Sequence, residues 1–427
     1  MLLRQQNIVS NDIKHRLSTN TLSNTKRIHR WGNFIAGFSI EFVEQCLSVM
    51  MPGPEAGSII DPFSGCGTTL IAAKNLGFKA VGYELNPIFH TVSSGKLQHY
   101  CVEDLEHILS NVKEISDPLL WSDDAVKFLS KLFTVENLNL ISIAISNLSK
   151  VSPDLHSLAV VMILRACELS CGSQTDGIYK APTSTKKHIP FNLAIELVAS
   201  EFMDDISSNW YQDHWVHTHS AKVIRKSALD MKEINPNSAG CCITSPPYLN
   251  NFDYAEMTRM QLYLLGWCSS WKNISENVRN HLITNTTTAL KGKKSSDYQN
   301  AARASIPNLL HSELDQLVNR LEKERAVRAG KKEYDYLIYP YYSQITQVLN
   351  SVFEALRPGG KIHWVVADAA LYGIHIETHE HTSLIMREIG FKDVKVKLLR
   401  QRGHRWVLSK RDGAKKGLGE YHIEAVK

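Results

Sequence analysis

The stretch of sequence that decides the fold is residues 57–74, GSIIDPFSGCGTTLIAAK. Its apolar start predicts a short buried strand, and the apolar run after Thr69 predicts a helix. Between them, Gly65 and Gly67 let the backbone turn sharply and let a ligand approach closely. The amides of such a loop, together with the helix N-terminus, favour a carboxylate or a phosphate. We therefore expect a strand, a ligand-binding loop and a helix, which together open an α/β sheet.

A second strand is predicted at residues 79–84, and it ends in the acidic residue Glu84. A carboxylate at that position commonly binds the two hydroxyls of a ribose. The preceding loop has the spacing F-x-G-x-G-T-T from Phe63, which differs from the G-x-G-x-x-G of dinucleotide-binding enzymes. The pattern indicates a ligand that carries a ribose.

The second informative stretch is TSPPY, residues 244–248. The apolar residues 240–243 predict the end of a buried strand, and two prolines then stop any helix or ladder, because neither has an N–H and each fixes φ. The Ser245 hydroxyl and the Pro246 carbonyl are thereby held at the carboxyl end of a strand, where open α/β sheets bind ligands. With the flat ring of Tyr248, they suit a planar group that carries an exocyclic amine. Taken alone, the stretch fits a proline-rich turn with a packed tyrosine about equally well.

Together, DPFSGCGTT at 61–69 and TSPPY at 244–248 resemble the S-adenosylmethionine-dependent amino-methyltransferases that modify DNA bases at exocyclic nitrogens. The resemblance covers roughly residues 28–95 and 220–427. HRW at 29–31 and GFS at 37–39 resemble the family's N-terminal helix motif, which lies beside the methionine end of the cofactor. The resemblance implies an α/β, Rossmann-like methyltransferase fold, with a mixed seven-stranded sheet, helices on both faces and a helical insertion.

The resemblance also implies a role for each matching residue. S-adenosylmethionine would be bound by Asp61, Phe63, Gly65, Gly67, Thr68, Thr69, Glu84 and Asp230, the last at the adenine. The catalytic residues would be Ser245, Pro246, Pro247 and Tyr248. Ser245 and the carbonyl of Pro246 would accept hydrogen bonds from the target amine, and Tyr248 would stack on a flipped-out base.

The order of the motifs predicts three parts of the chain. Residues 1–95 are an arm and the first part of the methyltransferase domain, 96–220 a helical insertion, and 221–427 the second part. Residues 269–335 carry 12 basic against 8 acidic side chains and are a candidate target-recognition insert. Further strands are predicted at 221–225, 361–367, 394–399, 406–409 and 422–426, further helices at 129–148, 155–169, 310–328 and 341–355, and a turn at 357–360.

Ser245, the first residue of SPPY, resembles the serine of the cytosine-N4 enzymes. The leading hypothesis is therefore a site-specific DNA methyltransferase that acts on cytosine N4, with adenine N6 as the alternative. Carbon-5 methylation is disfavoured, because it needs a cysteine nucleophile in a Pro-Cys motif, whereas Pro246 is followed by Pro247. An RNA base N-methyltransferase and a catalytically silent nucleic-acid-binding module are further alternatives.

Hydrophobic residues make up 43% of the chain and charged residues 21%, which is ordinary for a soluble globular protein. No apolar run reaches the roughly 18 residues that span a bilayer, so we expect a cytoplasmic protein without membrane contact. The eight scattered cysteines indicate reduced thiols, and we expect no metal site. Residues 391–427 carry 11 basic against 4 acidic side chains, which suits double-stranded DNA as a partner. A cognate restriction endonuclease is the second partner that the resemblance suggests.

Overall fold

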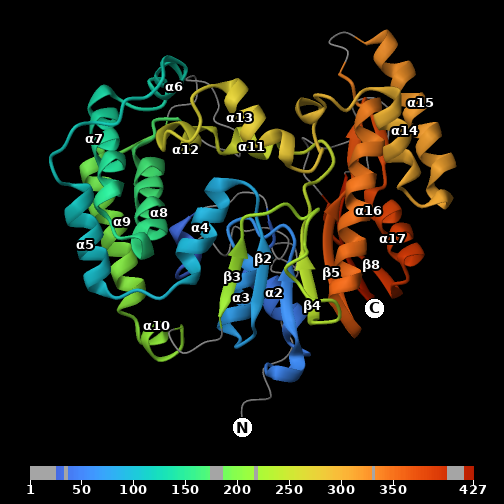
Figure 1. The fold of residues 1–427 in the computed structure, drawn as a ribbon, viewed down its shortest axis with the longest axis horizontal. Helices are drawn as coiled ribbons and strands as arrows, with labels where there is room; N and C mark the ends of the chain where they lie inside the picture. Colours follow the sequence, from blue (N-terminus) through green and yellow to red (C-terminus); the bar gives the residue numbers. More distant parts are fainter. Residues whose placement is uncertain (1–25, 33–36, 174–185, 216–219, 329–331, 402–417) are drawn as a thin grey trace.

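A central seven-stranded sheet organises the protein (Figure 1). The structure is a computed structural model that describes residues 26–32, 37–173, 186–215, 220–328, 332–401 and 418–427. The strands of the sheet are β1 Ser58–Asp61, β2 Ala80–Tyr83, β3 Ala221–Ile224, β4 Ala239–Thr244, β5 Leu356–Ala367, β8 Lys392–Gln401 and β9 Gly419–Val426. They lie in the order β3-β2-β1-β4-β5-β9-β8. Within this sheet, β9 runs opposite to the other six strands. The predicted mixed seven-stranded sheet of a Rossmann-like methyltransferase is confirmed.

The helices cover both faces of this sheet, and η denotes a short 3₁₀ turn. They are η2 His29–Trp31, α2 Ile40–Leu47, η3 Pro54–Ala56, α3 Thr68–Asn75, α4 Pro87–Leu97, α5 Val102–Val112, α6 Asp123–Leu129, α7 Val135–Ser146, η4 Asn147–Lys150, α8 Pro153–Ser170, α9 Phe191–Ile206, α10 Asn209–Asp213, α11 Tyr254–Met257, α12 Arg259–Leu264, α13 Trp271–Asn277, η6 Arg279–His281, η7 Thr287–Ala289, α14 Ser296–Ala304, η8 Asn308–Leu310, α15 His311–Val327, η9 Asp335–Leu337, α16 Ile338–Ala355 and α17 Thr378–Ile389. None of those in the described residues is long and apolar enough to cross a membrane.

Strand β4 lies at the centre of the sheet, and all six of its residues are buried. Its side chains alternate between two apolar clusters. Cys241 and Ile243 belong to the cluster that contains residues of α2, α3 and α8, whereas Cys242 belongs to the cluster that contains residues of α16 and α17. Burial on both faces explains why the strand is a continuous apolar run in the sequence.

The strand order reverses between β1 and β4, which pair in parallel through Ile59 with Cys241 and Ile60 with Cys242. In open α/β sheets, ligands bind outside the carboxyl ends of the strands at such a switch point. The loop after β1 and TSPPY after β4 leave the sheet at this place, so the topology brings the two motifs together.

Two groups of helices stand at opposite ends of the sheet (Figure 1). Helices α5 and α7–α9 lie beside the β3 end, and α14–α17 lie beside β5 and β8. Ile274 of α13 belongs to the apolar cluster that contains residues of α7, α8 and α9, whereas α14 and α15 contact α16. Residues 269–335 are therefore divided between the two groups.

Several local predictions need correction. The helix predicted at 129–148 starts too early: α6 ends at Leu129, and Thr134 caps α7 at Val135–Ser146, with its hydroxyl accepting from the Asn137 amide. The turn predicted at 357–360 lies inside β5, which bulges there: Ala239 pairs with Leu356, and Cys241 pairs with Lys361.

Other local predictions hold. The helix at 155–169 lies within α8, and the strands at 394–399 and 422–426 lie within β8 and β9. The small hairpin of β6 Ala369–Leu371 and β7 Ile374–Ile376 was not predicted. The strand predicted at 406–409 and most of the arm predicted before residue 26 fall outside the described residues.

Candidate active site

The loop after β1 begins at Asp61, whose carboxylate joins the two motifs. Its Oδ1 accepts hydrogen bonds from the Phe63 amide at 3.0 Å and from the Thr244 hydroxyl at 2.6 Å. Burial raises the pKa of Asp61 to about 6 despite these donors. Asp61 therefore holds the start of the loop against the end of β4.

Two glycines make the turn of this loop. Gly65 and Gly67 have φ of 50° and 87°, in the left-handed region. A Cβ on Gly67 would lie 2.5 Å from the Ser93 hydroxyl of α4, so that helix packs directly on the loop. Thr68 begins α3, and the Thr69 hydroxyl donates to the Ile243 carbonyl at 3.2 Å. The loop is thus tied to the end of β4 a second time.

Glu84 follows β2 and faces the same loop. Its carboxylate accepts from the Asn86 amide at 2.7 Å and from the Gly65 amide at 3.0 Å. Burial raises its pKa to about 7. Each carboxylate oxygen has a further lone pair, so Glu84 can still accept hydrogen bonds from two hydroxyls.

The TSPPY side chains form a chain of hydrogen bonds that ends on β9 and β8. Ser245 Oγ donates to Tyr248 OH at 3.2 Å, and Tyr248 OH donates to Glu420 Oε1 at 2.8 Å. Glu420 is 3% exposed, and its other oxygen accepts from Arg400 Nε at 2.6 Å. Burial and the Glu420 charge raise the pKa of Tyr248 well above its ordinary value. Tyr248 is therefore held by its hydroxyl, which fixes the position of the outer end of its ring.

The two carbonyls of the proline pair differ. The Pro247 carbonyl accepts from Tyr341 OH at 3.2 Å, which binds the motif to α16. In the part of the chain that the structure describes, the Pro246 carbonyl accepts no hydrogen bond. It is thus available to an amine, as is a lone pair of Ser245 Oγ.

The segment after TSPPY is fixed by two asparagines that sequence reasoning missed. Asn285 Nδ2 donates to the carbonyls of Tyr248 at 3.1 Å and Phe252 at 2.8 Å. Asn86 Nδ2 donates to the Thr258 hydroxyl at 2.9 Å. Neither contact has a local sequence signal, because its partners lie far apart in the chain.

Asp230 lies apart from this network. It follows β3 in a turn closed by its amide and the Ser227 carbonyl. Its Oδ1 is buried and makes no hydrogen bond to any residue that the structure describes, although Lys232 Nζ lies 3.5 Å away. Its charge contributes to the raised pKa of Tyr83, so it lies on the β2 side of the site. A contact between Asp230 and the adenine of a cofactor stays a prediction.

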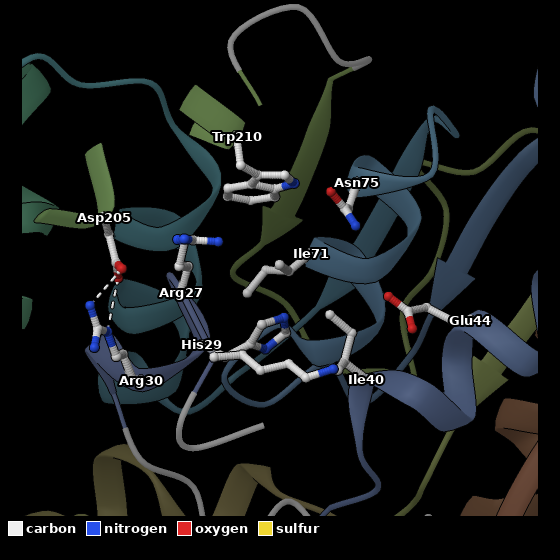
Figure 2. A pocket seen from close by; sticks show the side chains of 10 residues that line it. Arg27, His29, Arg30, Ile40, Glu44, Ile71, Asn75, Asp205 and Trp210 are labelled. Carbon is white, nitrogen blue, oxygen red and sulfur yellow. Dashed lines mark hydrogen bonds and ion pairs between the residues drawn. The ribbon is translucent and has the colours of Figure 1, made fainter. Parts of the chain in front are cut away.

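The HRW motif lies against α4 and α9. Lys96 Nζ donates to the carbonyls of His29 at 3.0 Å and Gly32 at 2.8 Å, and Arg30 pairs with Asp205 at 2.6 Å. His29 lines a pocket of about 560 Å³ together with residues of α2, α3, α9 and α10 (Figure 2). The motif is thus joined through α4 to the loop of Gly67, and its place beside the methionine end stays a prediction.

Comparison with known proteins gives matches over most of the chain. A family model described as DNA methylase, for N6 and N4 methyltransferases, matches residues 10–94. The Type II methyltransferase M.BsoBI of Geobacillus stearothermophilus is 25% identical over 421 residues, which span 88% of this chain and 81% of that protein. The Type II methyltransferase M.AvaI of Anabaena variabilis is 25% identical over 408 residues, with the same two shares. M.MjaII of Methanocaldococcus jannaschii, also a Type II methyltransferase, is 36% identical over 83 residues, 18% of this chain and 16% of that protein.

Proposed function

We propose that this chain, which belongs to the amino-methyltransferases of DNA, transfers a methyl group from S-adenosylmethionine to N4 of cytosine in a flipped-out base. The observation that carries this proposal is the pair of free acceptors, Ser245 Oγ and the Pro246 carbonyl, beside the held ring of Tyr248. The three groups stand at the switch point of the sheet, next to the loop after β1.

The acceptors would act on the target amine. Its lone pair is conjugated into the base ring, so it is a weak nucleophile that must be aimed. Hydrogen bonds from its two N–H groups to Ser245 and to the Pro246 carbonyl fix its direction and favour the positive charge that develops on nitrogen. The ring of Tyr248 stacks on the base, which offsets part of the few kcal/mol that flipping costs.

The residues around Glu84 fit S-adenosylmethionine. Glu84 offers buried carboxylate lone pairs to ribose hydroxyls, and the turn of Gly65 and Gly67 leaves backbone close to the ligand. Phe63 packs edge-on to Trp364, with ring centroids 6.2 Å apart, and presents an apolar surface beside the loop. When bound there, the cofactor supplies an electrophilic methyl group. The chain itself contributes binding and orientation.

The choice of base rests on a single residue type. Serine at the position of Ser245 resembles the cytosine-N4 enzymes. The Ser245 hydroxyl donates its hydrogen to Tyr248, so its oxygen can still accept a hydrogen bond from an amine. Adenine N6 is the second candidate, since the same acceptors suit its amine.

We further propose that the two helix groups flanking the switch point read the DNA. Residues 269–335 contribute to both groups, and Lys272 and Lys291 are exposed there. Phosphate contacts from such lysines position the duplex, and base contacts specify the site. Because the relatives are named Type II methyltransferases, we propose a restriction endonuclease of the same specificity as a partner in the cell.

The test is transfer of labelled methyl from S-adenosylmethionine to unmodified DNA, with total RNA in parallel, followed by mass spectrometry of the nucleosides. We expect N4-methylcytosine in the DNA digest. N6-methyladenine would keep the mechanism and change the base, whereas label in RNA alone would refute the DNA assignment. Ser245→Ala is expected to abolish transfer without loss of cofactor binding, and Ser149→Ala, an exposed serine of η4, serves as the matched control.

A further inference from the structure

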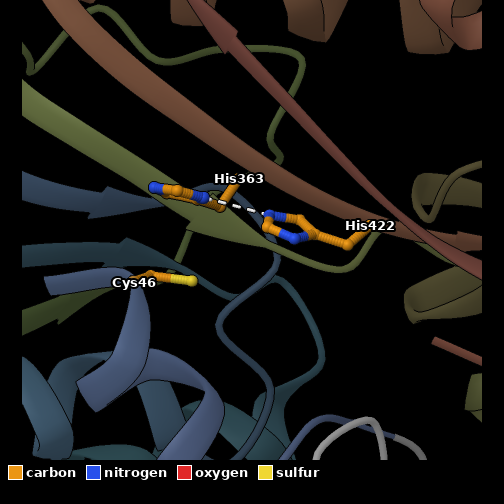
Figure 3. A group of neighbouring side chains, drawn as sticks. All are labelled: Cys46, His363 and His422. Carbon is orange, nitrogen blue, oxygen red and sulfur yellow. Dashed lines mark hydrogen bonds between the residues drawn. The ribbon is translucent and has the colours of Figure 1, made fainter. Parts of the chain in front are cut away.

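Three metal-ligand side chains from distant parts of the chain meet on the α2 face of the sheet (Figure 3). They are Cys46 of α2, His363 of β5 and His422 of β9, and their ligand atoms all lie within 4.8 Å of one another. Figure 3 shows the Cys46 sulfur below the two facing imidazoles. The cluster is separate from the TSPPY network, which no member of it contacts in the described residues.

Strand pairing places the two histidines on one face. His422 is opposite Val365 in the antiparallel pair of β5 and β9, and Val365 and His363 are two residues apart on the same face of β5. Helix α2 covers that face and contributes Phe42, whose ring lies edge-on to His422 at 5.1 Å between centroids. One turn further along α2, Cys46 comes over the histidine pair.

The histidines have few partners other than each other. His363 Nδ1 and His422 Nε2 are 3.0 Å apart, so one ring donates to the other. His363 is 4% exposed, and its Nε2 makes no hydrogen bond in the described part of the chain. Burying such groups costs free energy unless they are compensated.

We propose that Cys46, His363 and His422 bind one zinc ion, with the fourth position filled by water or an external ligand. Two imidazole nitrogens and one thiolate are a donor set that zinc prefers. With zinc–nitrogen bonds of about 2.0–2.1 Å, tetrahedral geometry puts the two nitrogens roughly 3.3 Å apart, so the 3.0 Å pair needs to open only slightly. His422 is only partly buried, which leaves a path for the ion.

Such an ion would fasten α2 to the sheet. The three ligands join an early helix to β5 and β9, which lie more than three hundred residues later in the chain. A closed loop of that length makes a metal clip stabilising, because it restricts the unfolded chain. The ion takes no part in the proposed methyl transfer, so its presence can be tested independently of that activity.

The experiment measures metal in the full-length protein. The chain is purified without chelator, dialysed against excess zinc and then freed of unbound ion, and the metal is counted by plasma mass spectrometry. We expect about one zinc per chain in the wild type and in Cys268→Ser, a buried-cysteine control outside the cluster, and less than about a tenth as much in Cys46→Ser and His422→Gln. Circular dichroism checks that each variant is folded.

A second measurement needs only the wild type and covers the case of a variant that does not fold. Cobalt(II) added to the zinc-free protein should give a thiolate-to-cobalt absorption band in the near ultraviolet that zinc abolishes. A wild type that retains no zinc after dialysis would overturn the proposal and leave a hydrogen-bonded histidine pair. So would a cobalt complex without the thiolate band, or a folded Cys46→Ser protein that keeps its zinc.

Discussion

Glu420 offers a sharp test of how the tyrosine of TSPPY is held. It lies on β9 and accepts the Tyr248 hydroxyl at 2.8 Å, 172 residues away in the chain. Glu420→Gln keeps the shape of the side chain but removes its charge, and Arg400 is exposed enough to be solvated when its partner is gone. The amide oxygen of this variant can still accept from Tyr248, so the expected loss is the difference between a charged hydrogen bond, about 1.5–3 kcal/mol, and a neutral one, about 0.5–1.5 kcal/mol. If that difference of roughly 1–1.5 kcal/mol falls on the transition state, kcat falls by roughly 5- to 13-fold.

Tyr248→Phe removes the other end of the same hydrogen bond, together with the one that Ser245 donates to this hydroxyl, and keeps the stacking ring. Since both changes act on the contact between Tyr248 and Glu420, the double variant should be no slower than the slower single variant, with a coupling energy of roughly 1–1.5 kcal/mol. The assay is steady-state methyl transfer with separate kcat and KM for DNA, and calorimetric cofactor binding as the control. Independent effects that simply add would show that Glu420 does not act through the hydroxyl, and the positioning role would be abandoned.

Three further predictions concern the loop after β1 and its neighbours. Gly67→Ala should lower the free energy of unfolding by more than the roughly 1–2 kcal/mol expected from left-handed φ alone, because the new Cβ meets Ser93. Urea titration tests this beside Gly77→Ala, since Gly77 has a φ of 80° but its new Cβ would meet only Pro52, at an ordinary contact distance of 3.6 Å. Equal costs in the two variants would contradict the prediction. Thr244→Val removes the hydroxyl that donates to Asp61 and should cost about 1–3 kcal/mol in the same titration; a change under about 0.5 kcal/mol would exclude a structural role for the contact. Glu84 has a folded pKa of about 7 against an ordinary 4.5, so between these pH values the folded protein binds a proton that the unfolded chain has lost. The stability of the cofactor-free protein should therefore fall as pH rises from about 4.5 to 7. Melting curves of Glu84→Gln should show a smaller slope, which comes from Asp61 and the other carboxyls whose pKa is raised by burial, and an unchanged slope would contradict this.

Much of the fold was predictable because its signals are local. The strand, glycine turn and helix of residues 57–74 are set by adjacent residues, and β4 shows as an apolar run because both of its faces are buried. Helix α8 was likewise predicted from its own spacing. The predicted ends of helices were wrong where a capping residue interrupts a continuous apolar pattern, as Thr134 does between α6 and α7.

The residues of the candidate site were likewise predictable only where their sequence signals are local. Asp61, the glycines, Glu84 and TSPPY follow strands directly, so the carboxyl ends of β1, β2 and β4 bring them together as the motifs indicate. Glu420, Arg400 and Asn285 were missed, because their roles depend on contacts that only the folded sheet creates. The same is true of the cluster of Cys46 and two histidines, whose spacing in the chain matches no metal motif.

The place of β9 in the sheet has a consequence for biosynthesis. This strand follows β8 in the chain but lies between β5 and β8. At about 5–20 residues per second, several seconds pass between the release of β5 and the release of β9 from a ribosome. During that interval β5 is an open edge, which is a template for pairing with other nascent chains. Glu420 also arrives only with β9, so Tyr248 lacks its anchor until then. A newly made chain should therefore depend on chaperones in this interval, and should become a competent enzyme only after its last described strand has been inserted.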